Sequence, residues 1–132
     1  MLSSNIGVDE KGRLTFAGMD TVELAEKYKT PLYLMDEDRI RANCRTYRAA
    51  MEKWFGAGSF PLYASKAASF KQIYRIMAQE GMAVDVVSSG EVYTAVHADF
   101  PMERAYFHGN NKTDEDIAYA MDCGLGCFVV DG

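Results

Sequence analysis

The stretch Phe60-Pro61-Leu62-Tyr63-Ala64-Ser65-Lys66-Ala67 decides how this sequence is organised. Its apolar first half predicts a short strand, which ends just before Lys66. A lysine ordinarily keeps its ammonium group in water on a solvated face, but Lys66 stands between a predicted strand and a predicted helix. In parallel α/β folds, ligands and catalytic side chains gather at the carboxyl ends of strands. Because desolvation favours a neutral, nucleophilic amine, Lys66 is a candidate covalent anchor for an aldehyde cofactor.

A helix is expected directly after this stretch. Ser69 and Gln72 have the spacing of a capping box, which predicts that the helix starts there. Its apolar stripe consists of Phe70, Ile73, Tyr74 and Met77.

The same strand-and-helix unit recurs along the rest of the chain. Strand-like segments occur at residues 62–64, 83–88, 105–108 and 128–130, and Tyr63, Asp85, Phe107 and Val129 mark equivalent positions about 22 residues apart. A short helix is predicted around residues 91–96, and another, with Ile117, Ala120 and Met121 as its stripe, from Thr113 to Gly124. This alternation predicts a parallel sheet with right-handed crossovers, either closed as a barrel or left open.

The pattern before residue 56 is different. Residues 9–16 predict a turn with a short strand, Asp20 caps a helix that ends near Lys29, and residues 31–34 predict a second strand. A longer helix follows over residues 38–55, with Ile40, Cys44, Tyr47, Met51 and Trp54 on one face and Arg41, Arg45 and Arg48 on the other. The basic face could bind an anion, although a solvated surface is the favoured interpretation.

Composition narrows the possible partners. The net charge is −5 and the basic residues are dispersed, which argues against nucleic acid or an anionic membrane surface as a partner. No basic and apolar leader and no bilayer-length apolar stretch is present in the sequence, so we expect a cytoplasmic protein. The three cysteines form no CxxC pair and the two histidines stand far apart, so no metal site is predicted.

Several polar residues follow the predicted strands. Asp85 lies in an apolar run, where a buried carboxylate needs a partner. The sequence leaves two partners open: Lys66, one strand away, or a helix N-terminus. Ser88 is expected to cap the next helix rather than to contact a ligand, and His108 and Asn110 come at the end of the following strand.

Four segments carry a resemblance to a known family. They are residues 30–33 (Thr-Pro-Leu-Tyr), 63–67 (Tyr-Ala-Ser-Lys-Ala), 85–91 (Asp-Val-Val-Ser-Ser-Gly-Glu) and 107–112 (Phe-His-Gly-Asn-Asn-Lys). In this order they resemble the opening motifs of the fold-type III pyridoxal-phosphate decarboxylases, over nearly the whole chain. The Tyr-Ala-x-Lys element is common to the group, whereas His-Gly-Asn-Asn-Lys is similar to the diaminopimelate decarboxylase branch.

The resemblance implies a specific chemistry. Lys66 would hold pyridoxal 5′-phosphate as a Schiff base and act as the catalytic lysine, with Asp85, Glu91 and His108 near the cofactor. Asp85 would tune the protonation of Lys66, and His108 would be a neighbouring group, because the family's stacking histidine comes from a later strand. The implied reaction is decarboxylation of meso-2,6-diaminopimelate to L-lysine, a step of lysine biosynthesis.

The resemblance also implies a fold and a domain division. Residues 36–132 would form about half of a (β/α)8 barrel of the alanine racemase-like type, since a whole barrel takes about 250 residues. Residues 1–35 would belong with a C-terminal β domain that lies downstream in the family. The complete protein would be a homodimer acting on a small amino acid, and this chain by itself is expected to be inactive.

Three alternatives remain open at this point. The substrate could be that of a related decarboxylase for ornithine, arginine or carboxynorspermidine. The chain could be a naturally short, non-catalytic protein that binds a partner. It could also be an unrelated doubly wound domain in which Lys66 meets a phosphate group as a point charge.

Overall fold

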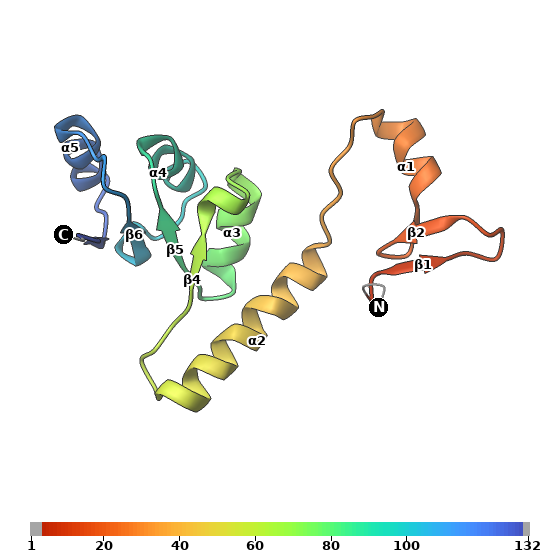
Figure 1. The fold of residues 1–132 in the computed structure, drawn as a ribbon, viewed down its shortest axis with the longest axis horizontal. Helices are drawn as coiled ribbons and strands as arrows, with labels where there is room; N and C mark the ends of the chain where they lie inside the picture. The colour runs from red at the N-terminus through yellow and green to blue at the C-terminus, as the bar shows by residue number, and fades with distance from the viewer. Residues whose placement is uncertain (1–3, 131–132) are drawn as a thin grey trace. The chain divides into compact units, whose positions relative to one another are not determined.

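The computed structural model describes residues 4–130, which form two compact units. The first unit ends at Asn43 and the second begins at Cys44, so that the long helix α2 (Glu37–Phe55) runs through the division. Figure 1 follows the order of the elements along the chain.

The first unit is a small antiparallel sheet followed by a helix. Strands β1 (Ile6–Val8), β2 (Leu14–Phe16) and β3 (Met19–Asp20) pair in sequence order, and α1 (Thr21–Tyr28) follows at once. The two residues between β2 and β3, Ala17 and Gly18, both have positive φ, which is the backbone of a type I′ hairpin turn.

Asp20 starts α1 as the sequence predicts. Its carboxylate accepts hydrogen bonds from the backbone N–H groups of Val22 (2.8 Å) and Glu23 (3.4 Å). It also accepts one from the Arg13 guanidinium at 2.8 Å, which is the main cause that lowers the pKa of Asp20. The helix ends at Tyr28, and Lys29 lies at its C-cap.

The strand predicted over residues 31–34 is not formed. This segment is irregular, and the Tyr33 side chain is 96% exposed. A strand needs a neighbour for its N–H and C=O groups, and within the described residues this segment pairs with none. The segment has the composition of a strand, but a strand forms only where a neighbouring strand pairs with it.

The second unit contains the predicted parallel sheet. Strands β4 (Leu62–Ala64), β5 (Ala83–Val86), β6 (Ala105–Phe107) and β7 (Cys127–Phe128) lie side by side in sequence order. Between them run α3 (Lys71–Gln79), α4 (Ser89–Val96) and α5 (Asp114–Asp122), which are packed along the sheet in Figure 1. Two short 3₁₀ turns complete the unit, η1 (Ser65–Ala67) and η2 (Met102–Arg104).

Strand register separates the sheet into a covered and an open face. Val84 pairs with Ala105 and Val86 with Phe107, and all four side chains are at most 1% exposed, so this face packs against the helices. The other face carries Ala64, Asp85, Tyr106 and Cys127, which pair in register and keep partial exposure. In a closed barrel this second face would be the interior.

The repeat predicted from the sequence is one residue too long. Tyr63 pairs with Val84, and Tyr106 pairs with Cys127, so paired positions stand 21 residues apart rather than about 22. Since side chains alternate between the two faces, this single step places Asp85 on the face opposite to Tyr63.

In the second unit, the starts of α4 and α5 agree with the sequence and the start of α3 does not. Ser88 caps α4, and Thr113 caps α5 in a reciprocal capping box with Asp116. Ser69 was expected to cap the next helix with Gln72, but α3 starts after Phe70 without a side-chain cap. The Ser69 hydroxyl lies instead 3.1 Å from the Tyr74 hydroxyl, so a tertiary contact replaces the local one.

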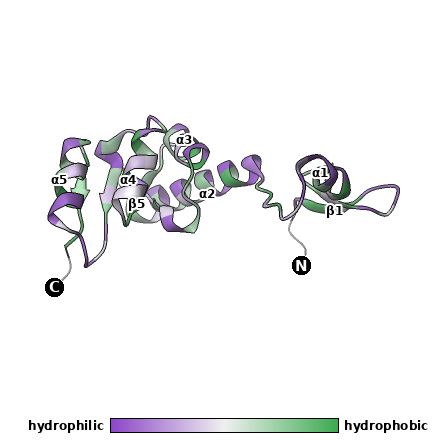
Figure 2. Cartoon of the chain, turned by 90° about the horizontal axis from the view of Figure 1, so that it is seen from above, coloured by the Kyte–Doolittle hydropathy of each residue, from purple (hydrophilic) through white to green (hydrophobic). Residues whose placement is uncertain are grey.

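The second half of α2 packs on α3. Cys44 is buried, with its sulfur 3.7 Å from that of Met77, whereas Tyr47 and Trp54 on the predicted apolar face are exposed. Figure 2 shows hydrophilic and hydrophobic stretches alternating along this helix. Phe70 and Met121, members of the stripes predicted for the later helices, are exposed as well.

The predicted basic face of α2 is largely solvated at Arg45 and Arg48, which are exposed, but both residues also contact Glu80. Arg45 makes two hydrogen bonds of 2.8 Å to the carboxylate of Glu80, and Arg48 donates to the Glu80 carbonyl oxygen at 2.9 Å. Glu80 is only 7% exposed at the C-cap of α3. The basic face therefore helps to fix α2 on the end of α3, because cations are favoured beside a helix C-terminus.

A close backbone contact sets the position of β7. A Cβ at Gly126 would overlap the carbonyl oxygen of Glu103, and the Gly126 N–H donates to the Met102 carbonyl at 2.9 Å. Only glycine allows this approach of two backbone segments. Among residues 4–130, no helix combines the length and the apolar composition needed to cross a bilayer.

Candidate functional site

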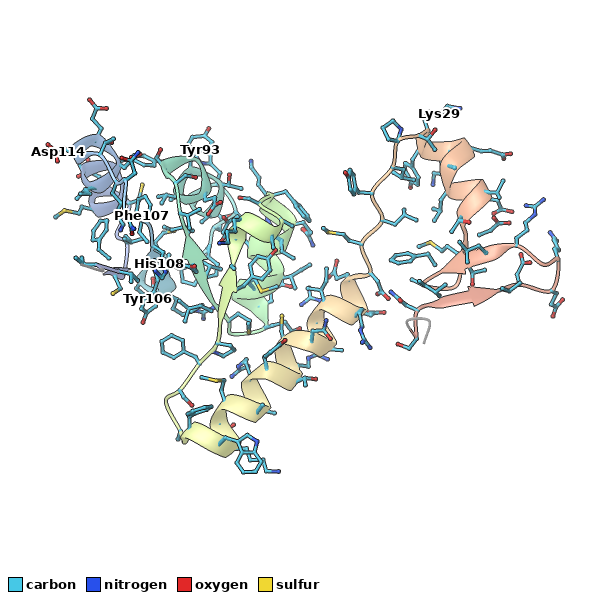
Figure 3. All side chains as sticks on the ribbon, viewed as in Figure 1. Lys29, Tyr93, Tyr106, Phe107, His108 and Asp114 are labelled. Carbon is cyan, nitrogen blue, oxygen red and sulfur yellow. The ribbon has the colours of Figure 1, made fainter. Side chains whose placement is uncertain are left out.

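The ends of the parallel strands bring the predicted site residues to one edge of the sheet. Ala64 pairs with Asp85 and Val86 with Phe107, so Lys66 and His108 follow the carboxyl ends of β4 and β6, the two strands on either side of β5. Figure 3 shows Tyr106, Phe107 and His108 in sequence at the end of β6. Catalytic and binding residues gather at this edge in parallel barrels.

Lys66 lies in the 3₁₀ turn η1, directly after β4. The Ala68 N–H donates to the Ser65 carbonyl at 3.1 Å, which closes the turn, and Ser65 is fully buried while Lys66 is exposed. Within residues 4–130 the Lys66 amine has neither a hydrogen bond nor an ion pair. Its Nζ is thus available for a reaction with a ligand.

Two tyrosines brace the segment that carries Lys66. The Tyr63 hydroxyl donates to the Ala68 carbonyl at 3.1 Å, and the Tyr74 hydroxyl contacts Ser69 at the same distance. Burial raises the pKa of both phenols, and the hydroxyls of Ser65 and Ser69 partly oppose this effect at Tyr74. The turn is therefore held from the strand and from α3 at once.

Asp85 lies on the open face of the sheet, one strand from Lys66. Its Oδ1 is buried and accepts no hydrogen bond within the described residues. The Nδ1 of the His108 imidazole lies 3.5 Å from this oxygen. The predicted pairing of Asp85 with Lys66 is not formed here and stays a prediction for the protein with its cofactor.

Ser88 and Glu91 make a local capping arrangement. The Ser88 hydroxyl accepts from the Glu91 N–H at 3.2 Å, as the sequence predicts, and Glu91 Oε2 accepts from the Val87 N–H at 2.8 Å. The Glu91 carboxylate is therefore already held at the strand end, with one oxygen in use.

A cavity of about 260 Å³ lies beyond the end of β6, lined by residues 107–112 together with Val87 and Asp116. Lys112 shapes its rim, because the Lys112 amine donates to the carbonyls of Gly109 and Val129, the second at 2.9 Å. This lysine joins the loop after β6 to the end of β7. Asn110 lines the same cavity.

Sequence reasoning missed the supporting residues of this site. Tyr74 was assigned to an apolar stripe, although its hydroxyl contacts Ser69 next to Lys66. Lys112 was noted only as part of a motif. Its hydrogen bonds to the carbonyl groups of Gly109 and Val129 depend on the conformation of the loop after β6, which periodicity does not predict. For Tyr74 the available signal was a hydroxyl on an apolar helix face, since such a group needs a partner when it is buried.

This chain is similar to known proteins in sequence and in fold. A diaminopimelate decarboxylase of Bacillus methanolicus is 44% identical over 124 residues, which cover 94% of this chain and 28% of that protein. Among solved structures, diaminopimelate decarboxylase of M. jannaschii in complex with L-lysine is 36% identical with a TM-score of 0.88, and the match covers 98% of this chain and 30% of that one. A lysine/ornithine decarboxylase of Vibrio vulnificus in complex with putrescine is 28% identical with a TM-score of 0.74, covering 85% and 30%.

These proteins are much longer than the present chain, which spans about 28% of the curated relatives it matches. The four strands and their helices are correspondingly part of a barrel, as the sequence predicts. The family model described as the pyridoxal-binding domain of pyridoxal-dependent decarboxylases matches residues 37–132. The chain therefore belongs to the pyridoxal-dependent decarboxylase family, in which it forms part of the pyridoxal-binding domain.

Proposed function

We propose that the full-length protein decarboxylates meso-2,6-diaminopimelate to L-lysine and that Lys66 binds its cofactor, pyridoxal 5′-phosphate. The observation that carries the proposal is the place of Lys66, an exposed and unpaired amine in a braced turn at the carboxyl edge of a parallel sheet. The substrate is supported by relatives named diaminopimelate decarboxylase at 42–44% identity.

The residues present fit a pyridoxal group. The Lys66 amine is a nucleophile suited to the cofactor's aldehyde. Asp85 Oδ1, a buried acceptor without a donor, suits a protonated nitrogen on the open face of the sheet. We infer that Lys66 binds the cofactor covalently and that Asp85 lies beside it, with Glu91 and His108 farther out.

Held by Lys66, pyridoxal phosphate would supply an electron sink for the pair that is left on the substrate's α-carbon when carbon dioxide departs. The roles that we assign to this chain are binding and orientation. Tyr63 and Tyr74 hold the turn so that the Lys66 amine keeps its place at the strand edge. Asp85 stabilises positive charge close to that amine, and a proton replaces the lost carboxylate on the product.

We extend the proposal to the organisation of the whole protein. Residues 1–35 would belong with a second, β-rich domain and residues 36–132 with the barrel, a division that agrees with a family match beginning at residue 37. The complete protein would be a cytoplasmic homodimer, and this chain without the rest of the barrel would not catalyse the reaction.

The test is a decarboxylation assay on the protein at its full native length. Purified protein with pyridoxal phosphate should release carbon dioxide from meso-diaminopimelate and form lysine, and Lys66→Ala should abolish the reaction. Lys71→Ala is the matched control, because Lys71 is an exposed lysine at the start of α3. Faster turnover of ornithine, arginine or carboxynorspermidine would contradict the assigned substrate, and no turnover with any of them would contradict the enzyme assignment.

A further inference from the structure

We propose that His108 is a positioning residue that acts on the Lys66 site through Asp85. In this inference, which rests on the proposed function, the imidazole of His108 holds the Asp85 carboxylate in place on the open face of the sheet. His108 would thus influence Lys66 without touching it.

The first observation is the unsatisfied oxygen of Asp85. Within residues 4–130 its Oδ1 is buried without a hydrogen bond, and His108 Nδ1 lies 3.5 Å away, slightly beyond an ordinary hydrogen-bond length. The Asp85 side chain is 22% exposed and that of His108 is 48% exposed. A small rotation of the imidazole would bring an Nδ1–H donor onto this oxygen, and a buried acceptor favours that arrangement.

The backbone fixes both residues for this contact. Asp85 pairs with Tyr106, and the His108 N–H donates to the Val86 carbonyl at 2.8 Å, which continues the parallel ladder by one step. Because side chains alternate along a strand, Tyr106 and His108 fall on the same face as Asp85. The imidazole and the carboxylate are therefore diagonal neighbours across two strands.

The two charged residues that line the cavity together with His108 are already engaged. Lys112 and Asp116 line the same cavity as His108. The Lys112 amine donates to two backbone carbonyls, and Asp116 accepts from the N–H and the hydroxyl of Thr113 at the start of α5. Asp85 is consequently the carboxylate that the imidazole is free to hold.

The route from His108 to Lys66 is short. Asp85 pairs with Ala64, the residue directly before the Lys66 turn, so the backbone places Asp85 opposite the strand end that carries the lysine. A fixed negative charge favours the protonated form of a nearby nitrogen. Without His108, the carboxylate would lose its neighbour and the pH at which the bound lysine nitrogen gains its proton would change.

The first test needs no cofactor. The ¹⁵N signals of the imidazoles are recorded by NMR in the cofactor-free protein at full native length, with and without Asp85→Ala. The ratio of Nδ1–H to Nε2–H forms of His108 should fall severalfold in the variant, because the neighbour of Nδ1 sets the tautomer. His97, whose Nδ1 lies 2.9 Å from the Tyr93 carbonyl, is the control and should not change. An unchanged His108 signal would overturn the proposal.

The second test is a double-mutant cycle on borohydride trapping of pyridoxal phosphate, measured across pH. His108→Asn and Asp85→Ala should each change the trapping rate near neutral pH by about threefold to tenfold. The double variant should differ from Asp85→Ala by less than about twofold, because His108 acts through Asp85. If the fold-changes in trapping rate of the two single variants multiplied in the double variant, His108 would act independently of Asp85 and the proposal would fail.

The two tests separate this proposal from the one it rests on. Trapping at a lysine other than Lys66 in the unmodified protein would refute the proposed cofactor anchor. The pair of Asp85 and His108 would then be judged by the imidazole signals, which do not depend on the cofactor.

Discussion

The Tyr63 hydroxyl donates a hydrogen bond to the Ala68 carbonyl oxygen, 3.1 Å away, across the turn that carries Lys66. Tyr63 belongs to β4 and Ala68 follows η1, so one contact joins the strand before the lysine to the segment after it. The lysine's backbone is therefore held by the sheet itself rather than by the loop alone.

Removing this hydroxyl tests the brace. Tyr63→Phe keeps the ring and leaves the half-buried Ala68 carbonyl without its donor, so the free energy of unfolding should fall by about 1 kcal/mol. Urea denaturation of the full-length protein measures the change. Tyr33→Phe is the matched control, because the Tyr33 side chain is 96% exposed. Equal stability of the Tyr63 and Tyr33 variants would show that the contact adds nothing.

Tyr74 should make stability depend on pH in the alkaline range. Burial raises its pKa, so the folded protein retains the phenolic proton where the unfolded chain has lost it. The associated stability is complete below the ordinary tyrosine pKa of about 10 and is lost as pH rises through the folded-state value. Denaturation between pH 9 and about pH 11.5 should show a shallower loss for Tyr74→Phe than for the unmodified protein. An identical slope in both proteins would contradict the shift.

Gly126 should tolerate no side chain. A methyl group there would overlap the Glu103 carbonyl, so Gly126→Ala should lower the free energy of unfolding by about 1–3 kcal/mol through backbone displacement. Gly90→Ala is the control, since a Cβ at Gly90 lies at ordinary contact distance, 3.8 Å from the Ser88 hydroxyl oxygen. Thermal unfolding compares the two, and a Gly126 variant as stable as the Gly90 variant would disprove the close approach.

The ion pair between Arg45 and Glu80 should matter more than exposed pairs on the same helix. Glu80→Ala removes two charge-assisted hydrogen bonds from a nearly buried carboxylate and leaves Arg45 without them, which should cost about 1.5–3 kcal/mol. Glu37→Ala removes the exposed pair with Arg41 and should cost about 0.5 kcal/mol. Chemical denaturation of both variants should give clearly different losses, and similar losses would mean that burial of Glu80 does not strengthen its pair.

The sequence predicted the elements whose signals are local. Asp20, Ser88 and Thr113 each cap the helix assigned to them, because a side chain can reach the N–H groups of its own helix. Short apolar runs between the helical stripes predict the four parallel strands, and each observed strand overlaps its predicted range.

The sequence failed where the deciding contact is distant. Residues 31–34 have strand composition but no neighbour to pair with among the described residues. The Ser69 hydroxyl contacts the Tyr74 hydroxyl instead of capping α3. Arg45 donates to the carboxylate of Glu80, which is 35 residues later in the chain. The approach of His108 to Asp85 depends on a register shift of one residue, which periodicity alone does not resolve.

The most direct measurement is to identify the lysine that binds the cofactor. The full-length protein is incubated with pyridoxal phosphate, reduced with borohydride, digested and analysed by peptide mass spectrometry. The account predicts the pyridoxyl adduct on Lys66, with no trapping in Lys66→Arg and normal trapping in Lys71→Arg. A stable adduct on another lysine, or reversible binding without any adduct, would contradict the assignment of Lys66 as the cofactor's covalent anchor.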